Sequence, residues 1–200
     1  DKEELVKVTK YFPRNEIFFL CMSMAACKTM MKAAHDIEYS TLVTVMARNG
    51  VDFGIKVSAL GNEWFIGQAQ MIDGLYFPGY KREDANPDIG DSAITGTAGV
   101  GAFGLANSPS ITSLSGGSAN DAIKYTNDTR KITITLNDTF SVPILDFQGT
   151  ATGIDIRKVM DTRMLPVIDT AIAHKKAGVG MIGAGVVRAP LEAFKQDLCA

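Results

Sequence analysis

The most apolar stretch of the chain predicts a helix that follows Pro13. Between residues 16 and 35 the polar side chains Lys28 and Lys32 recur at helical spacing, and nearly every other position is apolar. This pattern is typical of a helix that is buried on most of its faces. The preceding residues predict a short helix or linker, so residues 1–40 form an expected helical lead-in.

Between residues 41 and 70 the apolar positions change to a period of two, which predicts three antiparallel strands in a meander. Asn49-Gly50 is a strong signal for a two-residue type I′ hairpin turn, and Gly61-Asn62 predicts the second turn. Trp64 follows that turn, and we expect its large side chain to anchor the core.

The second half of the chain mixes helix and hairpin patterns. Helices are predicted over residues 92–106, 118–125 and 153–161 and from Pro190 onward, a hairpin with its turn at Asn137-Asp138 over 131–144, a buried strand over 165–173, and a glycine-rich turn over 178–185. Because this order lacks regular βαβ alternation, the predicted class is α+β. We expect residues 41–200 to form one domain of antiparallel hairpins packed with helices, with glycine-rich loops at its site.

The overall composition is that of an ordinary globular protein. Hydrophobic residues make up 46% of the 200 positions, charged residues 21%, and the formal net charge is −2. Nucleic-acid binding needs a basic stripe, so this balance argues against a nucleic-acid partner. Residues 52–155 hold twelve acids and six bases, whereas residues 156–200 hold four acids and seven bases. Either the basic tail folds over the acidic middle and makes a polar cleft, or both are solvated faces.

Three cysteines, an odd number without metal-ligand spacing, predict a reduced chain in the cytoplasm. Lys28 and Lys32 interrupt the most apolar run, so that run does not predict a membrane span. The chain opens on Asp1 instead of Met and shows no signal-peptide pattern, which leads us to expect a piece of a longer protein.

A loop dense in Pro, Gly, Asp and Asn, within residues 75–109, is the expected working surface because it lacks the apolar side chains that a core needs. Asp84, Asn86 and Asp88 alternate as in the opening of a calcium loop, but Ile89 stands where that loop requires Gly. Asp84 and Asp88 are therefore candidate Mg²⁺ ligands, and Asn86 is a candidate substrate ligand. The alternative is that such side chains only cap turns and helix starts.

Two G-x-G-x-x-G strings occur, at Gly99, Gly101 and Gly104 and at Gly178, Gly180 and Gly183. Such glycines let a phosphate approach backbone N–H groups at a helix start. The candidate phosphate or substrate ligands here are Ser92, Gly99, Gly101, Gly180 and Gly183. Neither string opens a βαβ unit, and close packing through small residues explains the first string at least as well. The chain has no P-loop Lys-Ser/Thr, so ATP hydrolysis is not predicted.

His174 and Lys175 precede the second glycine string, and Arg188 follows it. A histidine beside basic residues can bind or protonate an anionic substrate. We therefore take His174, Arg188 and Asp88 as candidate catalytic residues and Lys175 as a candidate substrate ligand. The alternative is an ordinary surface charge cluster.

Arg48 and Asp52 flank the Asn49-Gly50 turn and are candidate substrate ligands. By themselves they are ordinary residues of a hairpin tip. The sequence contains no recognisable Cys/His nucleophile pair and no G-x-S-x-G nucleophile elbow. It therefore does not predict covalent catalysis.

Several strings in the sequence are distinctive. They are ARNGVDFGIKVSALGNEWF, DGLYFPGY, EDANPDIGDSAITGTAGVGAFGLA, GIDIRKV and IAHKKAGVGMIGAGVVRAPLEAF. Through them, and over nearly all of the chain from Thr41 onward, the sequence resembles the YlbE/YahG-like bacterial family. Members of that family are longer, so the resemblance implies that this chain is their C-terminal part.

One branch of that family is similar to a subunit of oxamate carbamoyltransferase, which exchanges oxalurate and phosphate for oxamate and carbamoyl phosphate. The resemblance thus implies a carbamoyltransferase-like subunit for a small anionic substrate, with an FdrA-like partner related to acyl-CoA synthetases and a homo-oligomeric assembly. The usual signature Ser-Thr-Arg-Thr is absent, so the chemistry would use a different site. The alternative is a non-catalytic assembly subunit that docks its partner through residues 16–35 and through Tyr76, Phe77 and Tyr80.

Overall fold

A computed structural model describes residues 1–14, 18–87 and 92–195 of the chain and confirms the predicted α+β class. The strands are β1 (Val43–Arg48), β2 (Asp52–Val57), β3 (Phe65–Gln68), β4 (Asp73–Tyr76), β5 (Thr133–Val142), β6 (Gln148–Ile154), β7 (Val167–Ala173) and β8 (Met181–Arg188). The α-helices are α1 (Lys2–Tyr11), α2 (Phe18–Lys32), α3 (Ala93–Gly96), α4 (Pro109–Leu114), α5 (Ala119–Thr129), α6 (Ile156–Thr162) and α7 (Leu191–Lys195).

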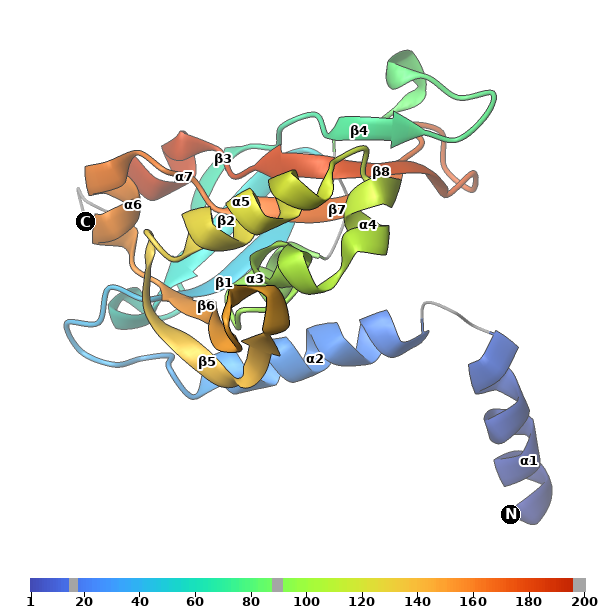
Figure 1. Ribbon diagram of the computed structural model, residues 1–200, viewed down its shortest axis with the longest axis horizontal. Helices are drawn as coiled ribbons and strands as arrows, with labels where there is room; N and C mark the ends of the chain where they lie inside the picture. Colours follow the sequence, from blue (N-terminus) through green and yellow to red (C-terminus); the bar gives the residue numbers. More distant parts are fainter. Residues whose placement is uncertain (15–17, 88–91, 196–200) are drawn as a thin grey trace.

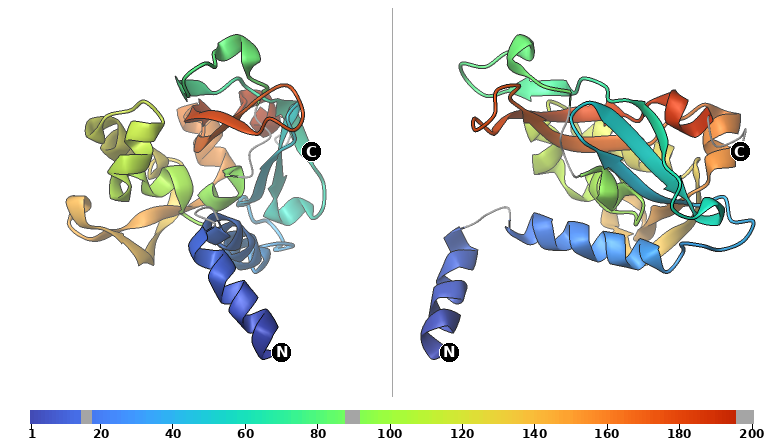
Figure 2. Two further views of the ribbon diagram at one scale, coloured as in Figure 1. Left: turned by 90° about the vertical axis from the view of Figure 1, so that its right-hand side faces the viewer. Right: turned by 180° about the vertical axis from the view of Figure 1, so that it is seen from behind.

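The described strands form three antiparallel sheets, with the orders β1-β2-β3, β4-β8-β7 and β5-β6. The β4-β8-β7 sheet lies between the β1-β2-β3 sheet and the helices α4 and α5 (Figures 1 and 2). One hydrophobic core joins these layers, and its largest fully buried side chains include Phe53, Phe103 and Phe194. Strand β7 is one of the two edge strands of its sheet, and α3 packs against it.

The predicted meander is confirmed as β1, β2 and β3, but its first turn is shifted by one residue. Arg48 pairs with Phe53, and the Asn49 N–H donates to the Asp52 carbonyl oxygen over 3.1 Å. The Asn49 side chain also accepts hydrogen bonds from the backbone at positions 51 and 52. The two turn residues are therefore Gly50, whose φ is +92°, and Val51. Asn49 is not a turn residue because its side chain caps the loop.

The turn predicted at Asn137-Asp138 is wrong. Strand β5 continues through both residues to Val142, and the chain reverses after Pro143 to pair β5 with β6. The register of that pairing shifts between Asn137 and Ser141. A bulge thus absorbs the turn-like residues inside one long strand.

The single helix predicted over residues 92–106 is also wrong. Helix α3 ends at Gly96, and a 3-10 helix, η4 (Gly101–Asn107), follows it. Gly99 lies between the two and Gly101 begins η4; their φ values are +81° and +68°, which a continuous α-helix cannot contain.

The glycine-rich turn predicted over residues 178–185 is correct only in its first part. Gly178 and Gly180 lie in the exposed turn between β7 and β8, whereas Gly183 and Gly185 lie inside β8. A Cβ atom on either strand glycine would lie 2.2 Å from a carbonyl oxygen of β4. These glycines therefore let β4 and β8 approach each other closely.

The helices predicted over 118–125, over 153–161 and from Pro190 correspond to α5, α6 and α7, although α6 begins only at Ile156, and the predicted buried strand corresponds to β7; helix α4 was not predicted. Ser118 caps α5 by accepting from the Asp121 N–H, and the Asp121 carboxylate accepts from the Ser118 N–H over 2.8 Å. Asp155 is the N-cap of α6. Helix α7 begins after Pro190 and buries Phe194, which stacks on Phe53 with ring centroids 6.4 Å apart.

Helix α2 is much more exposed than predicted. Of residues 18–32 only Met24, Cys27 and Met31 are buried, whereas Phe19 is 78% exposed and Met22 57% exposed. The helix lies along the outside of the body and α1, which has no buried residue, projects away from it (Figures 1 and 2). Within the described part of the chain, no helix is long and apolar enough to cross a membrane.

The expectation that Trp64 anchors the core is wrong as well, because 43% of the residue is exposed. Its ring covers Gly54, where a Cβ atom would lie 2.9 Å from the indole. The Lys56 ammonium lies 4.8 Å from the ring centroid, in a cation–π arrangement. Trp64 thus packs on the outer face of the β1-β2-β3 sheet.

Candidate functional site

A cavity of about 540 Å³ lies between the first glycine string and the edge of β7. Its polar lining consists of hydroxyl groups, an amide and one carboxylate, contributed by Ser92, Thr95, Asn107, Ser108, Ser115, Thr150, Asp169 and Thr170. The glycines of the string, Gly99, Gly101 and Gly104, complete this side. The volume is in the range of sites that bind small molecules.

The glycine string fits closely against the hydroxyl groups of β6 and α3. A Cβ atom on Gly99 would lie 2.2 Å from Thr152 Oγ1 and 2.8 Å from Thr150 Oγ1. A Cβ atom on Gly101 would lie 2.4 Å from Thr95 Oγ1. Glycine is therefore required twice, for the positive φ and for the close approach, and this packing places the backbone of the string at the cavity wall.

Two hydroxyl groups of the cavity have hydrogen-bonding capacity to spare. Thr150 and Thr170 are 2% and 5% exposed, and among the described residues neither Oγ1 atom has a hydrogen-bond partner. Thr95, also buried, instead donates its hydroxyl proton to the Ser92 carbonyl oxygen over 2.7 Å. Buried polar groups in proteins are nearly always paired, so the two threonines are suited to meet a polar ligand.

The only carboxylate in the described lining is Asp169, in the middle of β7. The Ser115 hydroxyl, at the end of α4, donates a hydrogen bond to Asp169 Oδ1. Burial raises the pKa of Asp169 to about 6, and the bond from Ser115 acts in the opposite direction. The cavity thus contains one group that can exchange a proton near neutral pH.

The opposite wall and the mouth of the cavity are apolar. Leu105 is buried there, whereas Leu20, Ile111, Leu114 and Met181 are each 43–45% exposed. No lysine, arginine or histidine belongs to the described lining. The site therefore offers hydrogen bonds and a low-dielectric wall, but not a positive charge of its own.

Three of the predicted ligands, Ser92, Gly99 and Gly101, lie in this cavity. Four other predicted site residues form a separate cluster at the end of β7 that is marked by Ala173: Asp84, Asn86, His174 and Lys175. Ala85 bridges to His174, and the Asn86 N–H donates to the Ala173 carbonyl oxygen.

In the same cluster, the Lys175 N–H donates to the Asp84 carbonyl oxygen over 2.8 Å, and the Lys175 ammonium donates to the Glu83 carbonyl oxygen. The Asp84 carboxylate accepts from the Lys81 N–H, as a turn cap does. The His174 ring lies edge-on to Tyr80 with centroids 5.8 Å apart. Residues 84–86 of the acidic loop and residues 173–175 therefore lie side by side, but not at the cavity lined by the first glycine string.

Gly180 accepts a hydrogen bond from the His174 N–H in the exposed β7–β8 turn, while Gly183 lies in the sheet against β4. Arg48 and Asp52 line a shallow depression of about 270 Å³ on the β1-β2-β3 sheet, beside Trp64. The Arg48 guanidinium donates to the Gln70 carbonyl oxygen over 2.8 Å. These candidates therefore lie in places separate from the cavity.

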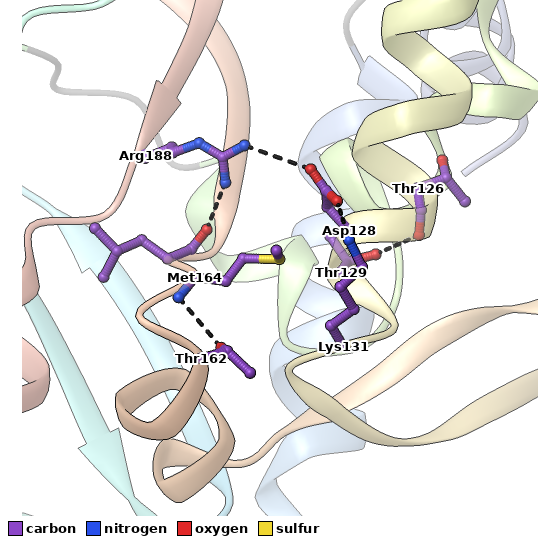
Figure 3. Close-up of polar contacts among 8 residues, drawn as sticks. Thr126, Asp128, Thr129, Lys131, Thr162, Met164 and Arg188 are labelled. Carbon is purple, nitrogen blue, oxygen red and sulfur yellow. Dashed lines mark hydrogen bonds and ion pairs between the residues drawn. The ribbon is translucent and has the colours of Figure 1, made fainter.

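Arg188 lies at the end of β8 opposite to His174, because Val167 pairs with Arg188 and Ala173 pairs with Met181. Its guanidinium donates to the Leu165 carbonyl oxygen over 2.9 Å and lies 3.8 Å from the Asp128 carboxylate (Figure 3). Asp128 also pairs with Lys131, which follows α5. Arg188 thus links β8 to α5, and the fold does not bring it to His174.

Asp88 lies outside the described residues. Among the residues that the structure describes, no three His, Cys, Asp or Glu side chains are arranged to hold a metal ion. The proposed Mg²⁺ site at Asp84 and Asp88 therefore stays a prediction.

Four residues of the cavity were not candidates from the sequence: Ser115, Thr150, Asp169 and Thr170. One signal was present: Asp169 interrupts a strand of otherwise apolar or small residues, VIDTAIA, where a buried carboxylate is uncommon. The hydroxyl groups gave no comparable signal, because serine and threonine are frequent throughout the chain.

Comparisons with known proteins place these observations in a family. Residues 1–92 match the family model described as oxamate carbamoyltransferase subunit AllG. The chain is 49% identical to the uncharacterized protein YahG of Escherichia coli K12, over 98% of this chain and 42% of YahG. It is 43% identical to the oxamate carbamoyltransferase subunit AllG of the same organism, over 99% of this chain and 48% of AllG.

A solved structure has the same fold. The crystal structure of a conserved protein of unknown function from Enterococcus faecalis V583 superposes with a TM-score of 0.95 at 47% identity, covering 100% of this chain and 48% of that chain. The chain therefore spans about half the length of the relatives that it matches.

Proposed function

This chain belongs to the AllG/YahG-like family, and from that relationship we propose that it is part of a carbamoyltransferase subunit. The substrates proposed are a small carboxylated amide of the oxamate or oxalurate type and phosphate. The relative named as an oxamate carbamoyltransferase subunit supports the reaction class, since 99% of this chain aligns with it.

The observation that carries the proposal is the cavity between Gly99 and the edge of β7. Carbamoyl transfer needs two small substrates held in contact and donors for the charge that develops on oxygen. Thr150 and Thr170 offer unpaired buried hydroxyl groups, and the glycine string brings backbone to the same wall. A cavity of about 540 Å³ is large enough for one small amide and one phosphate group.

Ligand-induced stabilisation of the full-length protein tests this proposal. The melting temperature should rise with oxamate, phosphate or carbamoyl phosphate at concentrations well above the dissociation constant. Thr150→Val removes a buried hydroxyl that has no described partner, so it should preserve the fold and reduce the ligand-induced rise. Thr44→Val changes a buried threonine outside the cavity and serves as the matched control.

Two results would reject the proposal. If the unmodified protein shows no rise with any of these ligands, the substrate class is wrong. If Thr150→Val keeps the full rise, as the control Thr44→Val should, the ligands bind elsewhere.

A second function, a non-catalytic assembly subunit, is favoured by a different observation. Helix α2 exposes four large apolar side chains, Phe19, Leu20, Met22 and Met30, and clustered exposed apolar side chains are typical of a protein–protein contact. On this proposal an FdrA-like partner covers the helix. Phe19→Asp should then abolish co-purification with that partner, and the ligand panel should give no thermal shift.

A further inference from the structure

We propose that Asp169, held by the Ser115 hydroxyl, is the group that exchanges a proton with the substrate nitrogen during carbamoyl transfer. This inference rests on the proposed function and adds a catalytic residue to it. Neither residue was a candidate from the sequence, and both lie in the cavity wall, where they contact each other.

The position of Asp169 suits a proton donor. It lies on the edge strand β7, and its neighbours Thr170 and Ala171 line the same cavity. Ser115 binds only Oδ1, which leaves Oδ2 for a substrate in the cavity. The apolar wall opposite lowers the local dielectric constant, which strengthens any hydrogen bond that the carboxyl group makes.

The electrostatic surroundings keep this carboxyl group protonatable. Burial raises the pKa of Asp169 to about 6, and an anionic substrate beside it acts in the same direction. The charged groups nearby line a neighbouring pocket that shares Ser115: Asp73 on β4, Arg188 on β8, and Asp121 and Lys124 on α5. Asp73 and Asp169 flank Val186 in the sheet, and Arg188 is held by Asp128.

The proposed step is balanced in both directions. A phosphate oxygen forms a bond to the carbamoyl carbon of oxalurate, the bond from that carbon to the oxamate nitrogen breaks, and the nitrogen takes the proton of Asp169. The carboxylate regains a proton from the acidic carbamoyl phosphate or from water. In the reverse direction, the Asp169 carboxylate accepts a proton from the oxamate nitrogen as that nitrogen attacks carbamoyl phosphate and phosphate leaves.

The test compares variants of the full-length enzyme, purified with the subunits that accompany it, in the direction that forms carbamoyl phosphate. Asp169→Asn should lower kcat by roughly 10²-fold or more and keep the ligand-induced thermal shift, because it removes only the exchangeable proton. In the unmodified enzyme, kcat/KM should fall about tenfold per pH unit above a pKa near that of Asp169, and this limb should vanish in the variant. Asp73→Asn, an exposed carboxylate on the same sheet face, is the matched control and should leave the rate unchanged.

Ser115 is a positioning residue, and the pH profile of a Ser115 variant tests the inference independently of Asp169→Asn. Since the bond from Ser115 lowers the pKa of Asp169, Ser115→Ala should move the pH limb to higher pH. An unmoved limb would overturn the inference even if Asp169→Asn failed to fold. Full turnover with an unchanged pH profile in Asp169→Asn would overturn it too, while leaving the proposed function intact. The proposed function itself fails if the unmodified enzyme neither binds the ligands nor turns them over.

Discussion

The Asp169→Asn substitution should stabilise the protein at neutral and alkaline pH. The folded state raises the pKa of Asp169 from its ordinary value of 3.8 to about 6, because the carboxyl group is buried. Between these two values the unfolded chain has lost its proton while the folded chain keeps it, so stability falls as pH rises. Asparagine has no proton to lose, and its side-chain oxygen can still accept the hydrogen bond from Ser115.

The size of the effect follows from the difference in pKa. At 1.36 kcal/mol per pKa unit, the ionised carboxylate costs roughly 3 kcal/mol once the pH is well above the folded value. About 1.4 kcal/mol of this cost accumulates between about pH 5 and about pH 8, and it is absent below the unfolded pKa. The stability difference between Asp169→Asn and the unmodified protein should therefore grow by that amount over this interval.

Urea denaturation at several pH values measures this difference directly. Subtracting the two stability curves removes the contribution of every other titrating group that the substitution leaves unchanged. Asp73→Asn is again the control, and its difference curve should be flat because Asp73 is exposed. Parallel curves for Asp169→Asn would show that Asp169 is not desolvated, and that would also remove the electrostatic support for its proposed role.

Three further predictions concern the scaffold around the cavity. Gly99→Ala should lower the free energy of unfolding by about 2–5 kcal/mol, since it adds both backbone strain at a positive φ and a clash with β6. Gly178→Ala has open space around its Cβ and should cost only about 1 kcal/mol, from the backbone strain alone. Urea denaturation of both variants therefore separates the strain from the clash. Phe194→Ala should cost about 3–5 kcal/mol in the same assay, because the ring is fully buried. Burial acts to raise the pKa of Asp155, but hydrogen bonds, chiefly from Arg157, hold this pKa below its usual range. Asp155→Asn should therefore destabilise the protein at neutral pH. The lost stability should shrink as the pH falls through the pKa of Asp155 in the folded state, which urea denaturation at several pH values measures.

Local patterns predicted the elements whose formation depends on neighbouring residues in sequence. The β1-β2-β3 meander follows from alternation, and α5 follows from the capping residues Ser118 and Asp121. The turn wrongly predicted at Asn137-Asp138 shows the limit of such signals. A two-residue turn signal competes with pairing to β6, and the long-range pairing of β5 decides the outcome.

The site was harder to predict because its parts are far apart in sequence. Ser115 and Asp169 are 54 residues apart and meet only through the packing of α4 on the sheet. The exposure of α2 was mispredicted for a similar reason. An apolar sequence pattern indicates which helix face is suited to be covered, but it does not tell which part of this chain or which other protein covers it. The glycine string was recognised, yet it packs against threonines of β6 and α3, and the helix that begins at Gly101 is a short 3-10 helix.

The charge of the cavity bears on how a carbamoyltransferase subunit would use it. Oxamate and phosphate are anions, and burying an anion without a cation is costly. The described lining offers hydroxyl groups, the glycine-string backbone and the Asp169 carboxyl group, which suit the uncharged amide end of a substrate. On the proposed function, the anionic end therefore points toward the mouth, where Leu20, Ile111, Leu114 and Met181 form an exposed apolar rim. A protein surface that covers this rim and carries basic side chains would complete the site, so on the proposed function this subunit is catalytic only in its assembly.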